Sequence, residues 1–220
     1  MNTSLSNSNL LPQHLRTLQD ESGLNIETIQ KAQLYSADAQ QLQQLLKRTD
    51  IHCAGIVFPY LHTAERAPYE FNVRLDDPVK RGDGEARYLR PAGSDNRLYI
   101  PFGVDDILRN AKMPLIVTEG EKKALAAVQH GFYAVAVGGV WNWLQKPRDE
   151  NGNKVKDAPG QPIADLDLIV WRGRIVHLVF DSDVTTKPEV RAALWALRCE
   201  LVRRGAKPHF VSLADGGEAA

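Results

Sequence analysis

Cysteine, net charge and long apolar runs are all scarce in this 220-residue sequence. The only cysteines are Cys53 and Cys199 and no Cys-x-x-C occurs, which excludes a zinc ribbon and a disulfide scaffold and fits a reducing cytoplasm. Lys and Arg total 27, as do Asp and Glu, so any nucleic-acid contact must come from a local basic patch. No apolar run reaches membrane-spanning length and the polar N-terminus does not resemble a signal peptide, so we expect a cytoplasmic protein without membrane contact.

One short apolar run, residues 115–117, predicts a buried strand that leads directly into a helix. Thr118 and Glu121 have the spacing of a capping box, so we expect the helix to begin there. Glu119 and Gly120 lie at the corner between strand and helix. A carboxylate at the carboxyl end of a buried strand faces the crevice where open α/β sheets bind ligands, and a glycine beside it permits close approach to the backbone.

A second apolar run, residues 175–180, ends in the motif Asp181-Ser182-Asp183. Side chains alternate along a strand, so Asp181 and Asp183 point the same way if the strand geometry persists. Taken singly, these acids and Glu119 are better explained as helix caps or dipole-stabilising residues, because caps are common. Together they would repel one another at neighbouring strand ends without a counter-ion, and carboxylates suit Mg²⁺ or Mn²⁺. The joint pattern therefore predicts a divalent-metal site.

The order of the elements predicts an α/β fold with a mainly parallel sheet flanked by helices. Three short helices are expected within a helical segment, residues 1–50, followed by a small β-rich subdomain, residues 51–112. The sheet domain would occupy residues 113–220, with an insertion at about 145–165 that forms a loop or hairpin. The β-rich subdomain carries arginines and acids in nearly equal number, which predicts either a solvated mixed-charge surface or an arginine-lined groove.

A pair of glycines, Gly138-Gly139, follows the strand expected at 133–137 and would also permit close backbone approach to a ligand. Trp141 and Trp143 come next. They could stack on a base, although tryptophans in such places more often close the edge of a core.

Glu119 and the Asp181/Asp183 pair resemble the TOPRIM domain, the catalytic fold shared by bacterial DnaG-type primases, topoisomerases and some nucleases. Two upstream segments, Ile56-Val57-Phe58-Pro59 and Ala86-Arg87-Tyr88-Leu89-Arg90-Pro91, are similar to the primase-core segment that reads roughly FPI…KYLNSP. Leu213-Ala214-Asp215-Gly216-Gly217 is similar to the acidic LPDG loop of primases, and Asp181-Ser182-Asp183 replaces the usual Asp-Gly-Asp. The resemblance is closest to primase-like proteins of plasmids, phages and integrative elements.

This resemblance implies a primase-like nucleotidyltransferase core that acts on single-stranded DNA and nucleoside triphosphates in replication of a mobile element, with a helicase domain as a possible partner. It implies that Glu119, Asp181 and Asp183 are catalytic and, with Asp215, hold Mg²⁺ or Mn²⁺. Contacts to nucleic acid or nucleotide would come from basic side chains: Arg74, Arg87, Arg90, Lys122 and Lys123. Two alternatives stay open: a TOPRIM metal-dependent nuclease with the same carboxylates, and a non-catalytic module that binds DNA or a helicase.

Overall fold

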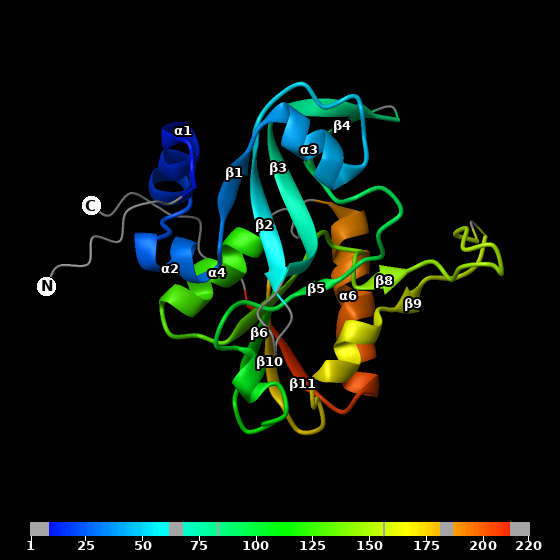
Figure 1. Ribbon diagram of the computed structural model, residues 1–220. Helices are drawn as coiled ribbons and strands as arrows, with labels where there is room; N and C mark the ends of the chain where they lie inside the picture. Colours follow the sequence, from blue (N-terminus) through cyan, green and yellow to red (C-terminus); the bar gives the residue numbers. More distant parts are fainter. Residues whose placement is uncertain (1–8, 62–67, 83, 156, 181–186, 212–220) are drawn as a thin grey trace, which may run out of the picture. The chain divides into compact units, whose positions relative to one another are not determined.

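The computed structural model of the protein describes residues 9–61, 68–82, 84–155, 157–180 and 187–211 (Figure 1). The chain forms two compact units, which divide between Ser94 and Asp95. Each unit has its own sheet. The division into three segments stays a prediction.

The first unit combines short helices with a four-stranded antiparallel sheet of order β1-β2-β3-β4. Its helices are α1 (Pro12–Arg16), continued by a π-helical turn η1 (Thr17–Glu21), α2 (Ile26–Lys31) and α3 (Ala39–Leu46). The strands are β1 (Tyr35–Ala37), β2 (Gly55–Leu61), β3 (Pro68–Arg81) and β4 (Gly84–Leu89). Three short helices and a β-rich stretch after them were predicted, whereas β1, which lies between α2 and α3, was not, because three residues carry too little period-2 pattern.

One face of this sheet packs against α3. Val57 lies opposite Val73, which lies opposite Leu89, and all three belong to one buried cluster with Leu42 and Leu46 of α3. Asp38 caps α3 in a full capping box with Gln41, in which each side chain accepts from the other residue's backbone N–H. The apolar side of this helix therefore covers the sheet.

A buried histidine ties α1 to the sheet of the first unit. His14 is 1% exposed, and its ring nitrogens lie 2.7 Å from Ser36 Oγ and 2.7 Å from Asp76 Oδ1. Ser36 Oγ also accepts from the backbone N–H of Leu11 at 2.7 Å. The Ser-His-Asp set is thus an internal cross-link between α1, β1 and β3.

The second unit is built on a five-stranded sheet of order β11-β10-β6-β7-β5. The strands β6 (Leu115–Glu119), β7 (Ala134–Val137), β10 (Ile175–Val179) and β11 (Lys207–Val211) are parallel, and β5 (Leu98–Tyr99) is antiparallel at the edge. Helices α4 (Glu121–Gln129) and α6 (Pro188–Arg203) and the 3-10 turns η2 (Asp105–Ile107) and η3 (Ala164–Leu168) accompany it. The predicted α/β fold with a mainly parallel sheet flanked by helices is confirmed.

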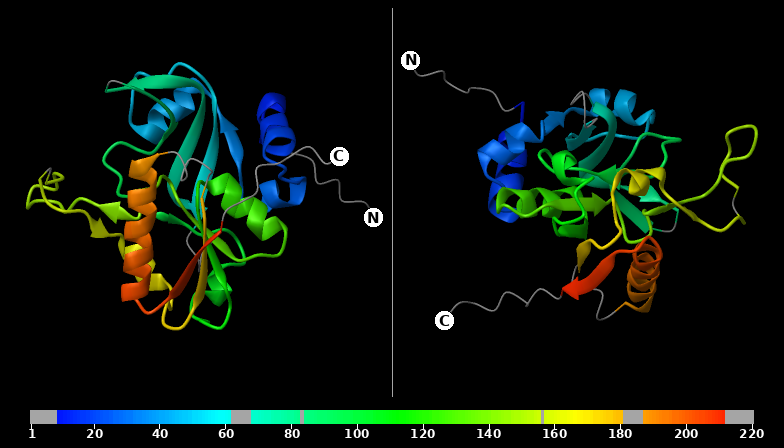
Figure 2. Two further views of the ribbon diagram at one scale, coloured as in Figure 1. Left: turned by 180° about the vertical axis from the view of Figure 1, so that it is seen from behind. Right: turned by 90° about the horizontal axis from the view of Figure 1, so that it is seen from below.

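The two long helices of this unit lie on opposite faces of the sheet (Figure 2). The chain moves one way along the sheet from β6 through α4 to β7, and the opposite way from β10 through α6 to β11. Because crossovers between parallel strands are right-handed, opposite directions place the helices on opposite faces. The core between the sheet and α6 includes Val117, Val176, Leu178, Leu194 and Leu197.

A fully buried arginine fastens the loops at the amino ends of these strands. Arg174 is 0% exposed, and burial lowers the pKa of its guanidinium. It donates to four backbone carbonyls, those of Val170 at 2.8 Å, Met113 at 3.2 Å, Ile107 at 3.0 Å and Leu108 at 2.8 Å. One side chain therefore joins the segment at residues 107–113 to the turn at residues 170–174.

The insertion forms the predicted hairpin, in which β8 (Leu144–Gln145) pairs antiparallel with β9 (Gln161–Pro162). Arg148, in the segment between these two strands, donates from Nη2 to Asp95 Oδ1 at 2.8 Å, which ties the hairpin to the rest of the unit. Of the described helices, none has both the length and the apolarity needed to cross a membrane.

The capping box predicted at the start of α4 is wrong. Gly120, not Thr118, is the N-cap of α4, and Lys187 precedes α6 without a side-chain cap bond. Thr118 is the fourth residue of β6, so its hydroxyl belongs to the strand. Sequence spacing cannot distinguish a strand residue from a cap when the strand runs directly into the helix.

Candidate functional site

Glu119 is the last residue of β6, where the chain leaves the sheet. It lies opposite Val137 of β7 in the parallel register, and Thr118 lies opposite Val179 of β10. Its side chain is partly buried. The backbone N–H of Gly120 donates to Val137 O at 2.9 Å, which fixes the turn out of the strand. Glu119 thus stands at the carboxyl edge of the sheet, where parallel α/β sheets bind ligands.

Gly120 supplies the backbone conformation that this turn requires. Its φ is +85°, in the region that side chains with a Cβ rarely adopt. No described atom would lie within 4 Å of an added Cβ, so the constraint is conformational rather than steric. The predicted place of Gly120 at the corner between strand and helix is confirmed, whereas close approach of a ligand to its backbone stays a prediction.

Gly138 and Gly139 follow β7 at the same edge, directly after the residue opposite Glu119. A Cβ on Gly139 would lie 3.1 Å from Asn142 Nδ2, a side-chain atom that can move. Trp143 is 4% exposed and belongs to the core, which confirms the core-closing alternative for that residue, whereas Trp141 is 44% exposed. Close backbone approach of a ligand at the glycine pair stays a prediction.

The other predicted metal ligands lie outside the described residues: Asp181, Asp183 and Asp215. The described chain stops one residue past β10, at Phe180, and again at the end of β11, at Val211. Both strands run parallel to β6, so the sequence positions of all four acids follow strand ends of one edge. Within the described ranges, no three His, Cys, Asp or Glu side chains gather as a metal cluster.

A second glutamate at this corner has a different environment. Glu121, the first residue of α4, is 2% exposed. Burial raises the pKa of Tyr99, and the nearby Glu121 carboxylate raises it further. Glu121 and Tyr99 are therefore two buried polar residues that interact electrostatically. Glu121 was recognised in the sequence Glu119-Gly120-Glu121, but its capping-box spacing from Thr118 led to the wrong role for it.

The predicted basic residues fall into two sets. Lys122 and Lys123 occupy the first turn of α4, directly after Glu119 and Gly120, and are partly buried. Arg74, Arg87 and Arg90 belong to the first unit. Arg74 lies opposite Tyr88 in the register of β3 and β4, so strand alternation places Arg87 on the other face of the sheet from Arg74.

Arg90 has the most distinctive surroundings of the predicted basic residues. Its guanidinium lies 4.9 Å from the centre of the Tyr60 ring and 3.9 Å from Glu70 Oε2. Its side chain is 14% exposed, and none of its three guanidinium nitrogens has a hydrogen-bond partner among the described residues. A buried guanidinium with unused donors has the capacity to bind an anion bidentately.

A model of the family described as "Domain of unknown function (DUF3854)" matches residues 104–219 of this chain, more than half of its length. The chain belongs to the DUF3854 family. The matched region begins before β6 and includes every predicted carboxylate of the site. An uncharacterized protein of Picosynechococcus sp. is 30% identical over 108 residues, 48% of this DUF3854 chain and 11% of that protein. The chain thus spans about a tenth of this curated relative.

Solved structures of bacterial primases share the fold of this DUF3854 chain. The Aquifex aeolicus primase, with its zinc-binding and RNA polymerase domains, has a TM-score of 0.59 at 14% identity, over 94% of this chain and 51% of that one. The DnaG catalytic core has a TM-score of 0.58 at 20% identity, over 97% of this chain and 68% of the core. The DnaG primase catalytic domain bound to ssDNA has a TM-score of 0.58 at 19% identity, over 98% of this chain and 68% of that domain's chain. The fold is that of a primase catalytic core.

Proposed function

We propose that this chain is a primase-like nucleotidyltransferase core, which joins nucleotides on a single-stranded DNA template. The observation that carries the proposal is that the fold match to primase cores covers both units, 94–98% of the chain, and not only the parallel sheet. A match limited to the sheet would suit a TOPRIM nuclease equally well. Glu119 supports the same reading, because it lies at the sheet edge where this chemistry would take place.

The donor set fits a hard divalent cation. We propose that Glu119, Asp181 and Asp183 hold Mg²⁺ or Mn²⁺, with Asp215 as a further ligand, since carboxylate oxygens are the ligands such ions prefer. Once bound, the ion would neutralise phosphate charge and polarise the reacting phosphoryl group. Glu119 is either one of these ligands or the general base that removes a proton from the attacking 3′-hydroxyl.

The basic residues would bind phosphates of template and nucleotide. Arg90 is the strongest candidate in the first unit, because its guanidinium donors have no hydrogen-bond partner among the described residues and the guanidinium lies over the Tyr60 ring. Arg74 and Arg87 would add further contacts from the two faces of β3 and β4. Lys122 and Lys123 would act beside Glu119, where the amino end of α4 also favours an anion.

The whole protein would work in replication of a mobile element, with a helicase domain in the same or a partner chain. A relative that is about nine times longer than the matched segment leaves room for such a domain.

Primer synthesis is the direct test. The chain is incubated with circular single-stranded DNA, labelled nucleoside triphosphates and Mg²⁺ or Mn²⁺, and products are resolved by length. We expect short oligonucleotides from the natural chain and none from Asp181→Asn. Glu150→Gln is the matched control, because it makes the same carboxylate-to-amide change at an exposed position of the insertion.

The same samples distinguish the alternatives. Nicking of supercoiled plasmid that needs Asp181 and occurs without nucleoside triphosphates would assign the nuclease. Binding of single-stranded DNA with neither product would assign the non-catalytic module. Either result contradicts nucleotidyl transfer.

A further inference from the structure

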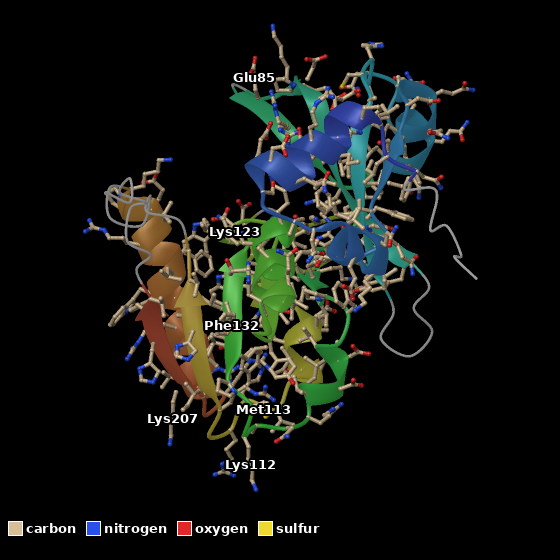
Figure 3. The ribbon with its side chains drawn as sticks, turned by 90° about the vertical axis from the view of Figure 1, so that its left-hand side faces the viewer. Glu85, Lys112, Met113, Lys123, Phe132 and Lys207 are labelled. Atoms are coloured by element: carbon tan, nitrogen blue, oxygen red, sulfur yellow. The ribbon has the colours of Figure 1, made fainter. Side chains whose placement is uncertain are left out.

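The face of the second sheet that carries α4 is covered only in part. Alternation along β10 buries Val176 and Leu178 against the α6 side and turns Ile175, His177 and Val179 to the other side. Ile175 is 43% exposed on that side. In the described part of the unit, α4 is the long helix on this face, and it packs on β6 and β7. Among the described residues, no helix covers this face of β10 and β11 beside α4 (Figure 3).

A groove of about 750 Å³ runs along α4 over this bare face. Its floor is apolar, formed by side chains such as Ile116 of β6, Val179 of β10 and Val211 of β11. Ala126 and Ala127 of α4 form one wall, and Phe132, 59% exposed, stands at its end. The small alanine side chains allow another backbone to come close to α4.

The strands of this sheet indicate which kind of element would cover the exposed face of β10 and β11. Parallel strands are normally buried on both faces by helices, because apolar side chains point to both sides. On the α6 side this rule is obeyed, and on the α4 side it is obeyed for β6 and β7 only. A helix laid beside α4 and across β10 and β11 would complete the layer.

The polar side chains around the groove favour one kind of helix. Its described lining contains Lys123, His130 and His177 and no carboxylate. Lys207 and His209 continue the same row of side chains along β11, opposite Ile175 and His177. A helix with acidic residues along its flanks complements such a rim.

One buried hydroxyl also points to an occupant. Thr118 lines the groove and is 2% exposed, and its Oγ1 has no hydrogen-bond partner among the described residues. A buried hydroxyl without a partner is uncommon in a finished protein interior. A polar side chain on the incoming helix, next to its apolar face, would satisfy it.

We propose that this groove is the docking site for an amphipathic helix of a partner protein, with an apolar stripe toward the sheet and acidic residues on its flanks. This inference does not depend on primer synthesis. Residues 212–220 of the chain itself, Ser-Leu-Ala-Asp-Gly-Gly-Glu-Ala-Ala, contain one large apolar side chain and two consecutive glycines, so they lack the composition of such a helix.

The test uses a synthetic helical peptide of about 20 residues with leucines at i, i+3, i+4 and i+7 and glutamates on both flanks. It is labelled with fluorescein and titrated with the full chain, and binding is followed by anisotropy. A peptide of the same composition with scrambled leucine positions, and one with lysines replacing the glutamates, are the controls. We expect saturable binding of the first peptide and at least tenfold weaker binding of both controls.

Variants of the chain test whether the peptide binds in the groove. Ala127→Arg would fill the groove wall and weaken binding at least tenfold, whereas Ala192→Arg makes the same change on the exposed side of α6 and would leave binding unchanged. Lys207→Glu, at an exposed position, would weaken binding of the acidic peptide and strengthen that of the lysine peptide. Thermal unfolding of each variant identifies any that fails to fold, and Lys207→Glu then carries the test.

Three results would overturn the proposal. The first is no saturable binding of the acidic peptide, and the second is equal binding by Ala127→Arg and the natural chain. The third is a self-associating chain in sedimentation whose dimer is dissociated by Ala127→Arg, because the occupant would then be a second copy.

Discussion

Val179 lies opposite Thr118 where β10 runs parallel to β6, so the residues after each of them leave the sheet at one edge. Glu119 is the residue that follows Thr118, and Asp181 comes two positions after Val179. The register therefore places the carboxyl ends of β6 and β10 side by side, and in the sequence the two predicted site segments, some sixty residues apart, follow these two ends. This relationship underlies the proposal that the carboxylates share one cation.

Glu119→Gln should abolish primer synthesis without unfolding the protein. The amide keeps the shape of the side chain but removes its negative charge and its ability to accept a proton. We expect a loss of at least about 100-fold in rate, the usual size of an acid–base or ligand contribution. Primer assays and urea unfolding of the same preparation check this, with Glu150→Gln as control. Full activity of Glu119→Gln would remove Glu119 from the site.

Arg90→Ala should weaken binding to single-stranded DNA about tenfold, the size of one charge-assisted contact. The slope of log K against log salt should also fall by about 0.7, because one phosphate contact is lost. Arg48→Ala is the matched control, since Arg48 belongs to the same unit and is paired with Asp50 at the surface. Fluorescence anisotropy at several salt concentrations measures both quantities. An unchanged slope would show that Arg90 does not contact phosphate.

Arg174→Met should destabilise the protein strongly, by about 3–5 kcal/mol. The substitution removes the guanidinium from four carbonyls, of which those of Ile107 and Leu108 keep a backbone donor. The carbonyls of Met113 and Val170 lose their donor, and each unsatisfied polar group costs about 1–3 kcal/mol before relaxation. Arg172→Met, two residues away and exposed, should change the free energy of unfolding by less than about 0.5 kcal/mol. Urea unfolding compares the two. Equal stability of both variants would contradict the bonding described for Arg174.

Asp165→Asn and Asp167→Asn make the same change two residues apart in η3 and should differ in effect. Asp165 is 7% exposed and accepts from Arg97 Nη1 and Leu98 N, each at 2.9 Å. Asp167 pairs with Arg204 but its side chain is 71% exposed. We expect a cost of about 1–3 kcal/mol for Asp165→Asn and less than about 1 kcal/mol for Asp167→Asn. The reverse order in thermal or urea unfolding would contradict this assignment.

Stability should fall in acid partly through Glu200. Hydrogen bonds from Arg203 and Arg204 lower the pKa of its carboxyl below the ordinary value of 4.5. A depressed folded pKa contributes stability above 4.5 that is lost as the pH falls below it. The natural chain should therefore exceed Glu200→Gln in stability at pH 7, and the gap should close in acid. Glu189→Gln in the same helix is the control, and a gap independent of pH would contradict the account.

The parallel sheet could be predicted from the sequence because its central strands are mostly apolar, as strands buried on both faces require. Leu115 to Val117 and Ile175 to Phe180 each gave that signal, and the glycine at position 120 marked the turn correctly. The same reasoning failed at Thr118, where capping-box spacing occurs by coincidence at the end of a strand.

Contacts between distant segments could not be predicted. Arg174 reads as one of two charges in an Arg-Gly-Arg turn, yet it is fully buried by loops from residues 107 to 113 and 170. His14 and Asp76 are 62 residues apart, and no local pattern relates them. The arrangement of the arginines of the first unit likewise depends on strand register, which a sequence of mixed charge does not specify.

The central claim is that Glu119 and the Asp181/Asp183 pair hold one divalent cation. The measurement that tests it most directly is an anomalous difference map from a crystal of this chain soaked in Mn²⁺. The account predicts a peak between the carboxyl ends of β6 and β10, in direct coordination with carboxylate oxygens of Glu119 and of Asp181 or Asp183. A saturated crystal with no peak there, or with a peak that Glu119 and the aspartates do not contact, would contradict it.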